Sequence, residues 1–251
     1  RRGLPAIQGI VALFDADDGV VLALMDSIEI TALRTAAATA VAARYLARKH
    51  SRTAAIVGCG RQGRVQLRAL RQVLPIGRVR VADTDRVAAA RFASAMSREL
   101  SIPVETAADP RAASRDADVV VTCTPSKEPL LHVGDLRPGS FLAAVGADAP
   151  EKQELDPRLL PGATLVVDIR EQCATIGELH HAIEAGLVTM ADVHADLAEV
   201  VSGRRPGRRT EEEIAIFDST GTALQDVAAA VAVYRAATRA GAGGRVTLAA
   251  P

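Results

Sequence analysis

Aromatic side chains and net charge are what this sequence has least of. Its 251 residues include no Trp, 2 Tyr and 4 Phe, and 30 Lys and Arg balance 30 Asp and Glu. Proteins that bind single-stranded nucleic acid stack the bases on aromatic rings and attract phosphates with positive charge, so this composition argues against a nucleic-acid partner. No apolar run approaches the length of a transmembrane helix, which argues against a membrane protein.

Cysteine is also scarce. The three residues Cys59, Cys123 and Cys173 are too few for a disulfide framework and lack the spacing of a metal site. We therefore expect reduced thiols, no metal and a cytoplasmic protein. The apolar content comes instead from Ala, Val and Leu, which is typical of helices packed on a buried sheet.

The stretch from Thr53 to Gln66 carries the most informative short motif. Its apolar run leads directly into Gly58-Cys59-Gly60-Arg61-Gln62-Gly63, and a helical pattern follows. A strand, a glycine turn and a helix in this order form the phosphate cradle of dinucleotide-binding folds. Gly58 permits a tight turn, Gly60 lets the backbone approach a pyrophosphate, and Gly63 lets the helix pack on the strand. The competing interpretation is an ordinary turn in another α/β fold.

Asp83 is the candidate ligand of the cofactor ribose. It closes the next apolar run and is followed by Thr84. A carboxylate in this place accepts hydrogen bonds from ribose hydroxyls and repels a 2′-phosphate. Arg86 is nearby but lies a turn into the next predicted helix, so we predict NAD rather than NADP.

Strand and helix patterns alternate from Arg52 onward. Strands are predicted at 53–57, 78–83, 118–122, 141–145 and 164–168, and helices at 62–74, 85–100, 109–115, 157–160, 178–186 and 190–202. This alternation predicts an α/β fold with a doubly wound parallel sheet. Ligands of such sheets bind at the carboxyl ends of the strands, which directs attention to 58–63, 83–84, 122–126 and 145–148.

Two of these strand ends carry polar residues that have two possible roles each. Thr124-Pro125-Ser126 offers hydroxyls to a ribose or nicotinamide, or is simply a turn that ends the strand. Asp148 is either a general acid/base above a cofactor or an aspartate that caps a turn. The residues alone leave both alternatives open.

The flanking segments follow a different pattern. A hairpin is predicted over residues 5–26, and a helix from about Ile28 to Lys49 follows it. A last strand at 214–218 precedes a helix from about Thr222 to Arg239. Arg34, in the first of these helices, is either a surface cation or a clamp for an anionic group.

Two further features are weaker candidates. Adjacent residues on a helix point about 100° apart, so His180 and His181 are not expected to share a metal. The basic loop at 203–209 is followed by three glutamates at 211–213. We therefore expect its arginines to pair with carboxylates rather than with nucleic acid.

Several longer motifs together resemble the ornithine cyclodeaminase/mu-crystallin family. They cover the chain in order, and they comprise Leu4–Gly9, Leu13–Asp15, Ile30–Ala37, the glycine loop, Val145–Leu155, Gly207-Arg208 and Phe217–Asp226. The strings RTAA, GADxPxKxEL and FDSxGxAxxD are more specific than the glycine loop. They favour the functional interpretations of Arg34 and Asp148.

The resemblance implies a Rossmann-like NAD-binding domain, residues 34–221, inserted in a smaller α+β domain for substrate binding and dimerisation, residues 1–33 and 222–251. It implies a homodimer that pairs through these outer domains. It also implies that a usual member carries further N-terminal residues, among them a catalytic lysine and a carboxylate-binding arginine, ahead of the stretch that matches here.

The family's chemistry, as the resemblance implies it, is redox at the α-carbon of an amino acid. The leading expectation is an NAD-dependent cyclodeaminase that converts L-ornithine to L-proline and ammonia through an imine. The alternatives are an NAD-dependent alanine dehydrogenase or an imine or ketimine reductase of the same family, and a non-catalytic nucleotide-binding protein.

The resemblance also assigns roles to single residues. Asp148 is expected to be the acid/base beside the reacting amine, Arg34 to contact cofactor phosphates or the substrate carboxylate, and Thr220 to lie near the substrate. The predicted cofactor-binding residues are Arg34, Gly58, Gly60, Arg61, Gln62, Gly63, Asp83, Thr84, Thr124, Pro125, Ser126, Leu142, Ala143, Ala144, Val145, Lys152 and Ser219.

Overall fold

The computed structural model of the protein describes residues 8–246, so the start of the predicted hairpin at residues 5–7 lies outside the described residues. The chain divides into two compact units. Unit 1 consists of the residues up to Arg34 and those from Ala223 onward, and unit 2 runs from Thr35 to Thr222. Helix α1 (Ser27–Leu46) begins in unit 1 and ends in unit 2.

Unit 2 is built on one parallel sheet of eight strands in the order β11-β10-β12-β8-β6-β3-β4-β5. The strands are β3 (Thr53–Val57), β4 (Arg78–Ala82), β5 (Val104–Thr106), β6 (Val119–Thr122), β8 (Phe141–Ala144), β10 (Thr164–Val167), β11 (Ala195–Asp196) and β12 (Ala215–Asp218). The predicted parallel α/β sheet is confirmed. Strands β5 and β11 were not predicted, because they are too short to show an apolar pattern.

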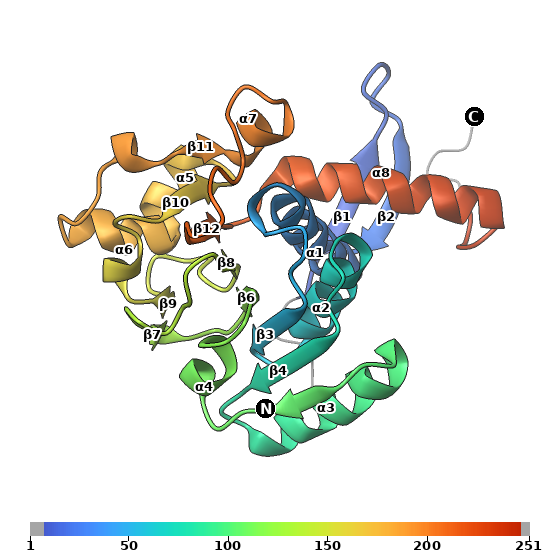
Figure 1. The fold of residues 1–251 in the computed structure, drawn as a ribbon. Helices are drawn as coiled ribbons and strands as arrows, with labels where there is room; N and C mark the ends of the chain where they lie inside the picture. The colour runs from blue at the N-terminus through green and yellow to red at the C-terminus, as the bar shows by residue number, and fades with distance from the viewer. Residues whose placement is uncertain (1–7, 247–251) are drawn as a thin grey trace. The chain divides into compact units, whose positions relative to one another are not determined.

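Helices cover both faces of this sheet (Figure 1). One core contains the end of α1 with α2 (Arg61–Val73), α3 (Arg86–Leu100) and α7 (Leu197–Val201). The other contains α4 (Pro110–Ser114), α5 (Arg170–Ile176), α6 (Glu178–Glu184) and the small parallel pair β7 (Lys127–Leu131) and β9 (Gln153–Leu155). Strand side chains alternate between the two cores, which is why these strands are nearly all apolar.

Some predicted elements are wrong in kind or extent. The helix predicted at 190–202 is broken into a 3-10 turn, η2 (Met190–Asp192), then β11, then α7. The break occurs where the backbone joins the edge of the sheet, since the His194 N–H donates to Leu165 O at 2.9 Å. The helix predicted at 157–160 is a 3-10 turn, η1 (Pro157–Leu159), and α5, β7 and β9 were not predicted.

Unit 1 contains the predicted hairpin and the C-terminal helix. Strands β1 (Ile10–Phe14) and β2 (Val21–Asp26) pair antiparallel, and α8 (Ala223–Ala240) packs against β1. An isolated hairpin is marginally stable in water, so α8 supplies packing that the hairpin requires. Helix α8 ends at Ala240, and the next residue, Gly241, has a φ of +63°, the left-handed conformation typical of a helix stop.

A buried carboxylate links the amino ends of β3 and β6. Asp118 accepts hydrogen bonds from the Arg48 and Arg137 guanidinium groups, both at 2.7 Å, and from the backbone N–H groups of Arg52 and Thr53 at 2.8 and 3.0 Å. Burial alone raises the pKa of Asp118, but the hydrogen bonds from Arg52 and Thr53 and the Arg137 charge bring that pKa below its ordinary value. This end of the sheet is therefore held by a neutralised ionic network.

The basic loop at 203–209 also has a structural role. Arg208 donates to the backbone carbonyls of Leu46, Ser140 and Glu213 at 2.6, 3.1 and 2.7 Å. Arg209 pairs with Glu213 at 3.4 Å, which confirms the predicted pairing for this arginine.

The Asp118 network gives a stability prediction. Asp118→Asn removes the negative charge that pairs with two arginines and replaces one acceptor oxygen by an NH2 group, so we expect the free energy of unfolding at pH 7 to fall by about 3 kcal/mol. The folded-state pKa lies below the unfolded one, so this contribution is present above the unfolded pKa and is lost as pH falls through the folded pKa. Urea titrations at a series of pH values should show that the difference in free energy of unfolding between wild type and variant becomes smaller in acid.

The control is Asp116→Asn, two residues away. The Asp116 side chain is 72% exposed and pairs with Arg80 at the surface, so its loss should cost no more than about 0.5 kcal/mol. The role given to Asp118 would be contradicted if both variants lost the same free energy of unfolding. It would also be contradicted if the loss in Asp118→Asn did not depend on pH.

Candidate functional site

The turn between β3 and α2 is shaped by its three glycines. Gly58 has φ +106°, and its N–H donates to Ala82 O at the end of β4 at 2.9 Å. A Cβ on Gly63 would lie 2.2 Å from Gly58 O, whereas a Cβ on Gly60 would meet nothing within 4 Å. The geometry therefore fits the three predicted roles: Gly58 makes the tight turn, Gly63 allows the close helix–strand contact, and Gly60 leaves the backbone open to a ligand.

The start of α2 offers hydrogen-bond donors at this turn. Gly60 is the N-cap residue and has no side chain, so it supplies no side-chain acceptor to the first turn of the helix. The first N–H groups of an α-helix have no intrahelical acceptor and attract anions. Gln62 Oε1 is buried and has no hydrogen-bond partner among residues 8–246. The free N–H groups at the helix start fit a bound phosphate group, whereas Gln62 Oε1 is an acceptor and suits a hydroxyl or N–H of a ligand.

Asp83 connects the end of β4 to the glycine turn. Its Oδ2 accepts the Cys59 N–H at 2.7 Å and its Oδ1 accepts the Asp85 N–H at 2.9 Å. The Thr84 hydroxyl lies 3.5 Å from the same Oδ1. Sequence reasoning predicted only a ligand contact for Asp83 and missed this role in shaping the turn. A carboxylate has about four acceptor positions, so capacity remains for a ribose hydroxyl.

The end of β6 lies against the glycine turn. A Cβ on Gly58 would lie 2.9 Å from Cys123 O, and Thr124, Pro125 and Ser126 follow directly. The chain runs from β3 outward through β4 and β5 and then returns to β6 on the other side of β3. Ligands of open α/β sheets bind at the carboxyl ends of strands at such a reversal.

A buried glutamate that sequence reasoning did not select joins the ends of β6 and β8. Glu154 Oε1 accepts the Thr124 N–H at 2.6 Å and the Thr124 hydroxyl at 2.8 Å, and its Oε2 accepts the Gly146 N–H at 2.9 Å. Burial raises the pKa of Glu154, and these hydrogen bonds oppose the rise. The signal in the sequence is the glutamate within the GADxPxKxEL string.

Asp148 stands two residues beyond Gly146. Its side chain is 49% exposed, and its Oδ1 accepts a hydrogen bond from the Lys152 ammonium. Lys152, predicted as a cofactor contact, is thus the direct partner of the predicted acid/base. A solvent-accessible carboxylate beside an ammonium can exchange a proton with an amine.

The loop after β12 is held by Asp168, another residue that sequence reasoning missed. Asp168 accepts the Ser219 hydroxyl at 3.1 Å, the Thr220 hydroxyl at 3.0 Å and the Gly221 N–H at 2.6 Å. Asp168 directly follows β10, which pairs with β12. The predicted Ser219 and Thr220 therefore also lie at the carboxyl edge of the sheet.

The remaining predicted residues are placed differently. Leu142, Ala143 and Ala144 are buried inside β8, so their side chains belong to the two cores. Arg34 lies in unit 1, where its Nε is 3.2 Å from Asp226 Oδ1 and its Nη1 donates to Gln225 Oε1 at 3.4 Å. The other predicted site residues are all in unit 2.

The histidine pair departs from prediction. The rings of His180 and His181 lie 5.1 Å apart, and ligand atoms of both residues and of Glu184 fall within 4.8 Å of one another. Each histidine has a protein partner, since His181 Nε2 lies 2.8 Å from Lys152 O and His180 Nε2 lies 3.5 Å from Glu184 Oε2. The three cysteines are free, as predicted.

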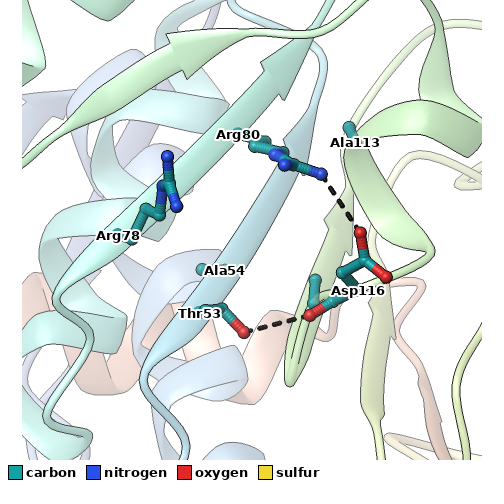
Figure 2. A pocket seen from close by; sticks show the side chains of 7 residues that line it. Thr53, Ala54, Arg78, Arg80, Ala113 and Asp116 are labelled. Carbon is teal, nitrogen blue, oxygen red and sulfur yellow. Dashed lines mark hydrogen bonds and ion pairs between the residues drawn. The ribbon is translucent and has the colours of Figure 1, made fainter.

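A cavity of about 100 Å³ lies at the other end of the sheet (Figure 2). It opens at the amino ends of β3 and β4 and is lined by Thr53, Ala54, Arg78, Arg80, Ala113, Asp116 and Ala117. Arg78 pairs with Glu105 and Arg80 with Asp116. The cavity is too small for a dinucleotide, and its lining includes none of the predicted site residues.

The helices of residues 8–246 include none with the length and apolarity needed to cross a bilayer.

The fold and the carboxyl-edge site define a Rossmann-like α/β protein. The sequence model of the ornithine cyclodeaminase/mu-crystallin family matches residues 1–241. The chain belongs to this family, which confirms the resemblance seen in the sequence.

Solved structures show the same similarity over nearly the whole chain. An archaeal alanine dehydrogenase dimer with bound NAD is 42% identical, with a TM-score of 0.94 over 98% of this chain and 76% of its own. A Δ1-pyrroline-2-carboxylate reductase from Thermococcus litoralis, in complex with NADH and L-proline, is 36% identical. Its TM-score is 0.94, and the match covers 97% of this chain and 76% of the reductase chain. A lysine cyclodeaminase is 37% identical, with a TM-score of 0.85, and the match covers 99% of this chain and 71% of the cyclodeaminase chain. The chain spans about three-quarters of the length of these relatives.

The glycine turn gives a matched pair of predictions. Gly63→Ala places a methyl group 2.2 Å from Gly58 O, so it should cost about 2 kcal/mol or more, or prevent folding. Gly60→Ala meets open space and loses only a small N-cap preference, so it should cost less than about 1 kcal/mol. Thermal unfolding of both variants measures these stability costs. Similar losses of stability in the two variants would show that the turn is not built as described.

Proposed function

We propose that this protein is an NAD-dependent oxidoreductase that acts at the α-carbon of a small amino or imino acid. The observation that carries the proposal is the arrangement of the glycine turn, the β6 end and the Asp148 segment along one edge of the sheet. The similarity to alanine dehydrogenase and Δ1-pyrroline-2-carboxylate reductase supports the same reaction type. Bound NAD supplies a hydride acceptor for the α-carbon.

The residues of the glycine turn fit this cofactor. The first turn of α2 and the open space at Gly60 suit a pyrophosphate, and Asp83 suits the ribose hydroxyls. The Asp83 carboxylate would repel a 2′-phosphate, which favours NAD over NADP. The structures with bound NAD or NADH support this choice. Thr124, Pro125 and Ser126 are proposed contacts for the other end of the cofactor.

Asp148 is proposed to hold and move the proton of the reacting nitrogen. Loss of a hydride from the α-carbon requires a nitrogen lone pair, so a protonated substrate amine must first give up a proton. Asp148 is exposed and able to accept it, and the adjacent Lys152 ammonium fixes the carboxylate. In the reverse direction Asp148 would return the proton to an imine.

The proposed substrate contacts are Arg34, which lies in unit 1, and Thr220, which lies in unit 2. Asp226 and Gln225 orient the Arg34 guanidinium, which suits a bidentate contact with a carboxylate. Asp168 orients the Thr220 hydroxyl. We propose that unit 1 carries the substrate and dimerisation functions and that unit 2 carries the NAD-binding function.

The second candidate is a cyclodeaminase that converts L-ornithine to L-proline and ammonia. The similarity to a lysine cyclodeaminase supports it. A cyclodeaminase returns its hydride to the cyclic imine, so ammonia appears without net NADH. A dehydrogenase forms one NADH for each ammonia released. The stoichiometry therefore separates the two reactions.

One assay tests the activity and the role of Asp148 together. The protein is incubated with NAD and either L-alanine or L-ornithine, and the reverse direction is run with NADH and Δ1-pyrroline-2-carboxylate, while NADH and ammonia are recorded. We expect turnover with NADH formed or consumed in step with substrate, and Asp148→Asn should lower kcat by about 100-fold or more.

The Asp148→Asn variant should bind NADH as wild type does, because the substitution changes little volume and lies away from the glycine turn. Ammonia from L-ornithine without NADH would select the cyclodeaminase. Full activity of the variant would refute the acid/base role. NADH binding without turnover on any of these substrates would favour a non-catalytic nucleotide-binding protein.

We further propose a homodimer that pairs through unit 1. Ile10 and Leu24 of the hairpin are 74% and 64% exposed, and Leu224 of α8 is 77% exposed. Ile10 and Leu24 lie on one face, since Leu24 pairs with Ala12 and alternate strand residues share a face. Exposed apolar surface of this kind is typical of an interface. The archaeal alanine dehydrogenase is a dimer in its structure.

The double variant Ile10→Glu/Leu24→Glu tests this interface. Charge on both strands should convert a dimer to a monomer in size-exclusion chromatography with light scattering. Leu187→Glu in unit 2, where Leu187 is 40% exposed, serves as the control and should remain dimeric. A wild-type monomer, or a double variant that stays dimeric, would contradict this interface.

A further inference from the structure

Three buried carboxylates support one another below the carboxyl edge of the sheet. Asp218, at the end of β12, accepts a backbone N–H from the start of α6 at 2.9 Å. Glu178, the first residue of α6, accepts two backbone N–H groups of β9 at 2.8 and 3.1 Å. Glu154, in β9, accepts the N–H groups that follow β6 and β8 at 2.6 and 2.9 Å. The support therefore runs from β12 through α6 and β9 to the two strand ends.

The last contact in this series leaves little freedom of movement. Both oxygens of Glu154 are occupied. Its side chain and the Thr124 carbonyl together fill the place where a side chain of residue 146 would lie, since a Cβ on Gly146 would be 2.4 Å from Thr124 O and 2.5 Å from Glu154 Cδ. The Thr124 hydroxyl also accepts the Ser126 N–H at 3.2 Å, so the whole turn after β6 is tied to Glu154.

The three buried carboxylates lower the stability of the fold. Burial raises the pKa of Glu178, and the nearby charges of Glu154 and Asp218 raise it further. Burial also raises the pKa of Asp218, to about 7. Buried acids that repel one another destabilise a fold, and perturbed groups of this kind concentrate where a functional site must be held in one geometry.

We propose that Glu154 is a positioning residue of the site: its buried carboxylate sets the spacing between the turn at Thr124 and the segment from Gly146 to Asp148. This rests on the proposed function, in which the first segment receives the reactive end of the cofactor and the second carries the acid/base. The Asp148 N–H donates to Gly146 O at 3.1 Å, so a displacement of Gly146 is transmitted to Asp148. Glu154 itself is fully buried, so its carboxylate is not accessible to a substrate or cofactor.

The variant Glu154→Gln tests this role with almost no change in shape. A glutamine side chain has one acceptor oxygen and one NH2 group, so either Thr124 or Gly146 must place its N–H against a donor. We expect the amide hydrogens of Thr124 and Gly146 to exchange about tenfold faster or more in the variant. Exchange is measured with residue-level fragmentation mass spectrometry, which needs no ligand.

NADH titration supplies a second readout that a merely structural role would not change. The glycine turn is untouched, so NADH affinity should stay within about threefold of wild type. The fluorescence of the bound nicotinamide reports the segment at Thr124, and its intensity and polarisation should shift in Glu154→Gln. The matched control is Asp156→Asn, which neutralises a buried acid two residues away that pairs with Arg158 and His132. It should change neither readout.

The outcomes separate the two proposals. Wild-type exchange rates and a wild-type NADH spectrum in Glu154→Gln would overturn the positioning role. Failure of wild type to bind NADH would refute the proposed function, while the exchange rates would still test the coupling of the two segments. If Glu154→Gln does not fold, Glu154→Asp keeps the charge but withdraws the carboxylate from both segments, and unchanged exchange at Thr124 and Gly146 in that variant would overturn the role.

Discussion

The contact between Gly63 and Gly58 is the constraint on which the proposed site depends. Because the first turn of α2 passes so close to the end of β3, no Cβ fits at Gly63, and the start of the helix is directed at the carboxyl edge of the sheet. Gly60 then remains open, and Asp83 holds the Cys59 N–H beside it. The same packing that completes the core thus exposes the helix start to a ligand.

The two ends of the sheet use buried carboxylates in opposite ways. At the amino end, Asp118 is neutralised by Arg48 and Arg137, and the network serves stability. At the carboxyl end, the buried Glu154 and the half-buried Asp168 receive backbone N–H and hydroxyl groups without an arginine or lysine among their hydrogen-bond donors in the described structure. Negative charge and fixed loops are therefore concentrated at the edge where we place the reaction.

Prediction from the sequence succeeded where the physical signal is local. The glycine turn, the long buried strands and the α8 stop at Gly241 each follow from a few neighbouring residues. It failed where distant contacts decide the structure. Strand β11 forms only because β10 offers an edge, and the role of Glu154 depends on two segments that meet in space. The pairing of Lys152 with Asp148 was likewise not predicted, since the motif that contains both residues indicates a role for each but no contact between them.

The edge formed by β3, β4 and β6 is where we propose that NAD binds. The most direct test is a fluorescence titration of the protein with NADH and, separately, with NADPH. We expect saturable binding of NADH that is at least about tenfold tighter than that of NADPH, because Asp83 repels a 2′-phosphate. Absence of NADH binding, or equal or tighter binding of NADPH, would contradict it.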